Sequence, residues 1–164
     1  YEISNYALPG FASRHNMKYW ALEEYVGFGP GAHSDFAGLR YSYIKDLEGY
    51  IDGIATGGAI IDEKEEIPLA ARADEYLMLG LRTVDGISTN KYMRSFHATS
   101  FEPIERVLES LIKYGYTQRA GDRWKLTPKG FLVSNQIIGK ILDAASNCSA
   151  GKSTQDGPDG GPGI

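Results

Sequence analysis

The sequence predicts an α+β fold in which most of the regular structure is helical. Residues 68–84 and 100–115 repeat apolar side chains at the spacing of one helix face. Residues 116–127 contain two short runs around Ala-Gly-Asp, the pattern of a β-hairpin. Helices with a few strands that do not alternate regularly with them are typical of the α+β class.

The first third of the chain predicts short elements separated by glycine and proline. Residues 1–7 alternate apolar and polar side chains, which predicts a strand that Pro9-Gly10 ends. Residues 16–24 are expected to form a short helix, and residues 25–28 a second strand. The glycines of residues 29–32 then predict a tight turn, because glycine adopts positive φ without strain.

The middle of the chain predicts one strand and two helices. Residues 40–44 read as a brief strand, and the next helix is expected to end at Gly57-Gly58. Its apolar face would consist of Leu47, Tyr50, Ile51 and Ile54. The acidic run at residues 62–66 is expected at the start of the helix that continues over 68–84, where the helix dipole favours negative charge.

The last part of the chain predicts helix, hairpin and helix, an order that resembles a winged-helix module. Ser88 and Ser100 are expected to cap two helices, and Thr127-Pro128 to open a final helix through Leu142. Residues 144–164 are rich in Gly, Ser, Asp and Pro, which predicts disorder.

Composition limits the class of protein. The 164 residues, 42% hydrophobic and 23% charged, suffice for about one domain, and no apolar run approaches the ~18 residues of a membrane span. Cys148 is the single cysteine, which excludes an internal disulfide framework and favours a reducing, cytoplasmic setting. A net charge of −4 argues against a general nucleic-acid binder.

His15 is the first candidate ligand. A neutral imidazole commonly binds iron, and Tyr19 and Trp20 follow at the fourth and fifth positions. If Asn16 caps the helix, His15 lies just outside its start and can face outward. A flat metal macrocycle needs one axial nitrogen and aromatic walls, and these three side chains supply both. The alternative is a histidine bound to a backbone carbonyl beside a core tryptophan.

The glycine turn is the second candidate. Gly29, Gly31, Ala32 and His33 would let a ligand approach the backbone closely. The turn is a poor dinucleotide fingerprint, since Pro30 lacks an N–H that could bind phosphate. A purely structural turn between strand and loop explains the same residues.

Two strings in this region carry a family resemblance. His15-Asn16-Met17-Lys18-Tyr19-Trp20 and Gly27-Phe28-Gly29-Pro30-Gly31-Ala32-His33-Ser34 resemble the radical S-adenosylmethionine proteins related to oxygen-independent coproporphyrinogen III oxidase. Within them, the His-Asn-x-x-Tyr-Trp motif is similar to that of the heme chaperone branch, where it is associated with heme binding.

The resemblance implies a domain plan and a site. Residues 1–45 would be the C-terminal remnant of a partial (β/α) barrel, residues 46–143 a mainly helical domain with the hairpin, and residues 144–164 the tail. His15 would be the axial metal ligand of heme, with Asn16, Tyr19 and Trp20 around it. Gly29, Gly31, Ala32 and His33 would lie near S-adenosylmethionine.

The chain departs from that family in its cysteines. A [4Fe-4S] cluster needs several thiolates, and one cysteine cannot supply them. The resemblance therefore implies the C-terminal part of a longer protein, with the cluster and S-adenosylmethionine belonging only to the full-length parent. No catalytic residue is expected in this part, whose partners would be heme and a heme-accepting protein.

Two other functions remain open. The parent could be an oxidase that decarboxylates coproporphyrinogen III in porphyrin biosynthesis, or the chain could be a winged-helix interaction module without catalysis. Nucleic-acid recognition is disfavoured, because the helix before the hairpin carries Glu102, Glu105 and Glu109, which repel phosphate.

Overall fold

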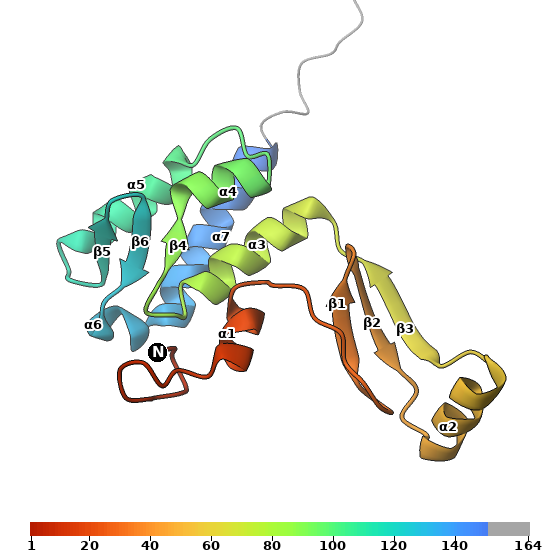
Figure 1. Cartoon of the computed structure of the whole chain (residues 1–164). Coiled ribbons are helices and arrows are strands. Elements are labelled where there is room, and N and C mark those ends of the chain that lie inside the picture. Colours follow the sequence, from red (N-terminus) through yellow and green to blue (C-terminus); the bar gives the residue numbers. More distant parts are fainter. Residues whose placement is uncertain (151–164) are drawn as a thin grey trace, which may run out of the picture. The chain divides into compact units, whose positions relative to one another are not determined.

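The computed structural model describes residues 1–150, with side chains through residue 146 (Figure 1). The chain divides into two compact units. Unit 1 consists of residues 1–6 and the chain from Tyr76 onward, and unit 2 is Ala7–Glu75. Helix α3, Leu69–Gly80, contributes residues to both units.

Unit 2 contains a three-stranded antiparallel sheet in the order β1-β2-β3. Its strands are β1 (His33–Phe36), β2 (Leu39–Tyr43) and β3 (Ile61–Glu66). Helix α2, Leu47–Thr56, connects β2 to β3 and lies at one end of the sheet in Figure 1. Asp46 caps α2 and Gly57 ends it with a φ of 70°, so the predicted helix and its glycine stop are confirmed.

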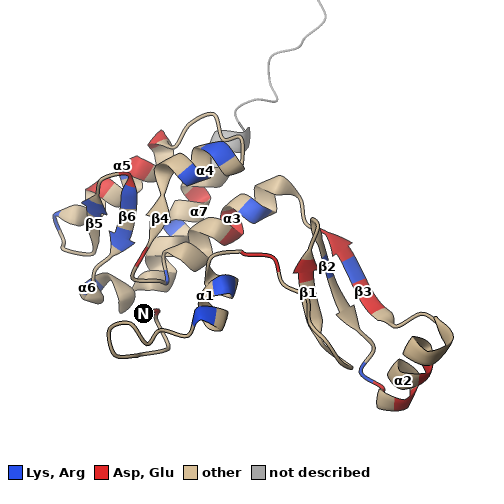
Figure 2. Cartoon of the chain, in the orientation of Figure 1, with Lys and Arg blue, Asp and Glu red and all other residues tan. Residues whose placement is uncertain are grey.

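The acidic run is a strand, which corrects the prediction that it opens a helix. In β3, Glu65 lies opposite Arg40 and Lys64 lies opposite Tyr41, and Figure 2 shows one positive stretch between two negative ones along the strand. Opposite charges on neighbouring strands favour pairing, and every residue of β3 is exposed. Helix α3 begins only after Pro68, at Leu69.

The two strands predicted near the start of the chain are also absent as strands in the described residues. Glu2 and Tyr25 each form only an isolated bridge, to Thr83 and Asp35 respectively. The Glu2 carboxylate accepts hydrogen bonds from the Ser4 backbone and the Asn5 side chain. Such local bonds turn the chain and compete with an extended ladder.

Unit 1 contains a second antiparallel sheet, in the order β4-β6-β5. The strands β5 (Thr117–Ala120) and β6 (Arg123–Leu126) form the predicted hairpin, with Gly121 at a φ of 64° in its turn. Strand β4 (Ile87–Ser88) pairs with β6. The helices of this unit are α4 (Thr89–Ser95), α5 (Glu102–Ile112), α6 (Pro128–Phe131) and α7 (Ser134–Ala150).

Large apolar side chains form the core of unit 1. Six of them are almost wholly excluded from solvent: Leu77, Leu81, Ile87, Leu108, Trp124 and Ile141. The predicted caps at Ser88 and Thr127 are confirmed, since each hydroxyl accepts a backbone N–H of the following helix. The predicted cap at Ser100 is wrong, because Phe101 stands at the N-cap of α5. The α+β class predicted from the sequence is confirmed.

Some helix ends differ from the prediction. Helix α3 ends at Gly80 rather than residue 84, and the last helix is split into α6 and α7. Helix α7 continues to Ala150, beyond the expected end at Leu142. The predicted disorder of residues 144–164 concerns mainly residues that lie outside the described part. Within residues 1–150, no helix is both long and apolar enough to cross a bilayer.

Candidate functional site

The short helix α1, Arg14–Trp20, carries the candidate heme residues. Its N-cap is Ser13, whose Oγ accepts a hydrogen bond of 3.2 Å from the Asn16 backbone N–H. This corrects the prediction that Asn16 is the cap, because the serine hydroxyl one turn earlier already occupies that role. His15 therefore lies inside the first turn, yet its side chain is exposed.

His15 and Tyr19 lie on the same face of α1, as residues four apart on a helix do. The Tyr19 hydroxyl and the His15 Nε2 atom are 3.0 Å apart. The two rings meet edge to face, with centroids 5.1 Å apart. The structure thus brings these two predicted site residues into direct contact.

Tyr25 contacts Tyr19 from the segment that follows α1. Their ring centroids are 4.6 Å apart in an edge-to-face arrangement, a favoured geometry for aromatic pairs. Tyr25 also exchanges two backbone hydrogen bonds with Asp35 of β1, of 2.8 and 2.9 Å. Burial, and then the negative charge of Asp35, raises the pKa of the Tyr25 phenol.

Trp20, at the end of α1, is half-buried. Its indole Nε1 is buried and has no hydrogen-bond partner among the residues that the structure describes. A buried donor without a partner costs on the order of 1–3 kcal/mol. If Trp20 contacts a flat ligand, it does so through the apolar surface of its indole and not through Nε1.

The predicted glycine turn is held by Tyr50 of α2 and by Ile44, which follows β2. Gly29 donates its backbone N–H to the Tyr50 hydroxyl at 3.2 Å, and Gly31 donates to the Ile44 carbonyl at 2.9 Å. Ala32 donates back to the Gly29 carbonyl at 3.2 Å. The φ angles of 101° at Gly29 and 71° at Gly31 confirm the expected left-handed backbone.

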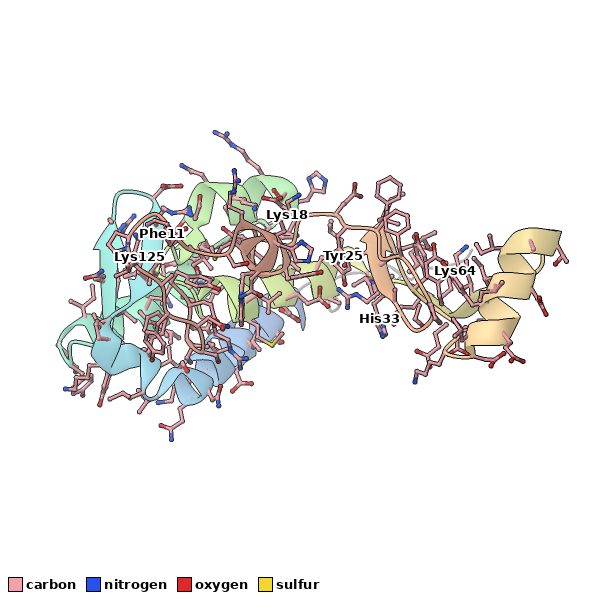
Figure 3. The ribbon with its side chains drawn as sticks, turned by 60° about the horizontal axis from the view of Figure 1, so that its bottom comes forward. Phe11, Lys18, Tyr25, His33, Lys64 and Lys125 are labelled. Atoms are coloured by element: carbon pink, nitrogen blue, oxygen red, sulfur yellow. The ribbon has the colours of Figure 1, made fainter. Side chains whose placement is uncertain are left out.

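His33 follows the turn as the first residue of β1. Its side chain is exposed, and in Figure 3 it projects from that strand. The neighbouring Ser34 is wholly buried, and its Oγ accepts the Gly27 backbone N–H at 3.0 Å. A Cβ atom on Gly27 would lie 2.4 Å from the His33 carbonyl oxygen, so this position requires glycine.

A cluster of four charged residues is centred on Asp35, the residue of β1 that pairs with Tyr25. The buried Asp35 carboxylate pairs with Arg72 of α3 and, at 3.0 Å, with Arg40 of β2. Arg40 also binds both carboxylate oxygens of Glu75, at 2.8 and 2.9 Å. The hydrogen bonds of Arg72 lower the pKa of Asp35, although burial opposes this effect.

The sequence analysis quoted Ser34 only as the end of the glycine string and gave no role in this region to Tyr25, Asp35 or Tyr50. Tyr25 lies in an apolar run and Tyr50 on an expected helix face, so each reads as a packing residue. The pairing of β1 with the Tyr25 segment is non-local, and no local pattern reports it.

Comparisons with known proteins extend these observations. Residues 67–133 match the family model described as the HemN C-terminal domain. The chain carries a HemN C-terminal domain. The matched residues contain helices α3 to α6 and strands β4 to β6, whereas α1 and the glycine turn precede them in the chain.

The chain is also homologous to proteins named heme chaperone HemW. It is 33% identical to the Bacillus subtilis (strain 168) protein over 142 residues, which is 87% of this chain and 38% of that protein. It is 34% identical to the Lactococcus lactis protein (strain IL1403) over 146 residues, with 87% and 37% covered. The chain thus spans less than two fifths of the length of these relatives.

A solved structure shares the fold. It is titled "Coproporphyrinogen III oxidase (HemN) from Escherichia coli is a Radical SAM enzyme", and the match has a TM-score of 0.52 at 15% identity. It covers 75% of this chain and 28% of that one. The sequence-based resemblance to this family is confirmed, while the expected barrel remnant at residues 1–45 stays a prediction.

Proposed function

We propose that the chain is the heme-binding portion of a heme chaperone, with His15 as the axial ligand. The observation that carries the proposal is the exposed His15 imidazole beside a Tyr ring, within a His-Asn-x-x-Tyr-Trp string. The names of the relatives from B. subtilis and L. lactis support the role of heme chaperone.

The residues present fit a porphyrin as cargo. A ligand imidazole must be accessible, and His15 is exposed. Binding sites for flat apolar groups need aromatic surface, and Tyr19 is 38% exposed beside it. Bound heme would supply an iron that accepts the lone pair of the imidazole. His15 would hold that iron, and Tyr19 and Trp20 would shield one face of the ring from water.

The remaining parts of the proposal concern the whole protein. Delivery to a heme-accepting protein in the cytoplasm would be its role. S-adenosylmethionine and a [4Fe-4S] cluster would be bound in the full-length form, with Gly29, Gly31, Ala32 and His33 near the former. The turn supports this placement only by the open space at Gly29, since nothing lies within 4 Å of a Cβ built on that residue.

Hemin titration tests the axial role of His15. We expect the chain to give a shifted Soret band on binding hemin, and His15→Ala to lose that shift and to weaken binding at least about tenfold, the effect of ~1.4 kcal/mol. His97→Asn is the control, because His97 is exposed and its φ of 49° suits asparagine. Identical spectra for the native chain and His15→Ala would exclude the axial role.

A further inference from the structure

If His15 binds iron through Nε2, that nitrogen already has a partner. The Nε2 atom lies 3.0 Å from the Tyr19 hydroxyl, and both residues are exposed. A neutral imidazole has one nitrogen with a free lone pair, and its other nitrogen carries the proton. A phenol that donates to Nε2 and a metal that coordinates Nε2 therefore need the same lone pair.

Two neighbouring rings hold the Tyr19 side chain beside His15. Its ring packs edge to face on His15 on one side, at 5.1 Å, and on Tyr25 on the other, at 4.6 Å. Tyr25 is in turn paired through its backbone with Asp35, which Arg72 and Arg40 bind. The Tyr19 phenol is thus held between a helix neighbour and a residue anchored to the sheet.

We propose that Tyr19 is a gate on His15, whose hydroxyl occupies Nε2 in the heme-free chain and must release it before His15 can coordinate heme iron. The inference rests on the proposed function and adds a residue that opposes binding. On release, the O–H···Nε2 hydrogen bond breaks, the phenol keeps its proton and bonds to water, and the Nε2 lone pair forms the coordinate bond. The imidazole proton stays on Nδ1 throughout.

The same contact also prepares His15 for its role. A phenol that donates to Nε2 selects the tautomer with the proton on Nδ1, and that tautomer leaves Nε2 able to coordinate. Tyr25 keeps the Tyr19 ring close to His15 after its hydroxyl is released. The ring can then act as a wall, whereas the hydroxyl, although it selects the coordinating tautomer, competes with iron for the Nε2 lone pair.

These two actions of Tyr19 can be separated by substitution. Tyr19→Phe keeps the ring and removes the competing hydroxyl, so we expect hemin to bind about 2- to 10-fold more tightly, the range of one hydrogen bond. Tyr19→Ala also removes the wall, so we expect binding weaker than in Tyr19→Phe. The control is Tyr6→Phe, which removes a hydroxyl from a side chain that is 89% exposed and should leave the affinity unchanged.

A second measurement does not need heme. The ¹⁵N chemical shift of the His15 Nε2 atom in the heme-free full chain reports the hydrogen bond directly. We expect Tyr19→Phe to change this shift and Tyr6→Phe to leave it unchanged. An unchanged shift in Tyr19→Phe would overturn the gate, because the hydroxyl would then not occupy Nε2.

The combined outcomes distinguish the gate from the proposed function. If His15→Ala weakens hemin binding and Tyr19→Phe binds hemin no more tightly than the native chain, the gate is wrong and the axial role of His15 stands. If His15→Ala binds hemin as the native chain does, the proposed function fails and the gate on heme fails with it. In that case the ¹⁵N shift still shows whether the hydrogen bond exists.

Discussion

The two units of the chain are stabilised in different ways. Unit 1 has a core of large apolar side chains, with Trp124, Leu77 and Leu108 fully buried. In unit 2 the buried side chains are mostly polar, namely Ser34, Asp35 and Ser42. Unit 2 also contains the His15 site and the glycine turn.

This difference indicates which interactions stabilise each folded unit. Burial of apolar surface is non-directional and contributes roughly 25 cal/mol per Å², so unit 1 gains stability from every side chain of its core. Unit 2 depends on directional contacts, such as the Asp35 pairs and the Ser34 bond to Gly27. Such contacts hold a site in one geometry, but a single substitution can remove them.

The largest expected effect comes from the core of unit 1. Leu108→Ala should lower the free energy of unfolding by about 2–5 kcal/mol, because a buried leucine is lost and a cavity remains. Leu108 is 0% exposed, whereas Leu132 is 85% exposed. The control Leu132→Ala should therefore change stability by less than about 0.5 kcal/mol. Urea unfolding followed by circular dichroism measures both, and equal losses would contradict an apolar core in unit 1.

The same difference explains which elements the sequence could predict. Leu77 and Leu81 of the stripe at residues 68–84, and Ile104 and Leu108 of the stripe at 100–115, are buried in unit 1, and helices formed near both positions. The hairpin and the caps at Ser88 and Thr127 depend on local turn and cap chemistry, which the sequence displays directly. Apolar periodicity and local cap signals are therefore sufficient to predict the elements of a unit whose core is apolar.

Sequence patterns were a poor guide in unit 2 because its contacts are polar and distant in the chain. The acidic run formed β3 through its pairing with β2, although its local charge favoured a helix start. Strand β1 was not predicted at all, since its four residues show no apolar alternation. The sequence placed His15 just outside the helix that carries Tyr19, whereas both residues lie on α1 and their polar atoms are 3.0 Å apart.

The second expected effect concerns the charged cluster of unit 2. Asp35→Asn should destabilise the sheet β1-β2-β3 by about 1.5–3 kcal/mol, the range of hydrogen bonds to charged groups. Amide hydrogen exchange in β1 and β2 would report this loss locally. Asp62→Asn is the control, because Asp62 is exposed on β3. Equal exchange in both variants would mean that the cluster does not hold the sheet.

The pH dependence of the same cluster has a defined sign. Because Arg72 lowers the pKa of Asp35 below its ordinary value of 3.8, the stabilisation is fully present above pH 3.8. It is lost as the pH falls through the lower, folded-state pKa. The protection factors of the native sheet, which correct for the intrinsic pH dependence of amide exchange, should therefore fall below about pH 4, and Asp35→Asn should remove this part of the dependence.

The smallest expected effect is at the cap of α1, and it tests whether the His15 site depends on a single directional contact. Ser13→Ala removes the Oγ acceptor of the Asn16 N–H and should cost about 1 kcal/mol of helix stability. Because α1 has seven residues and no buried side chain, little packing offsets the loss. Exchange of the Asn16 amide should accelerate about fivefold, the effect of ~1 kcal/mol. Ser13→Thr keeps the hydroxyl and should retain the native rate, and acceleration in this variant as well would indicate that packing, not the cap, holds the first turn.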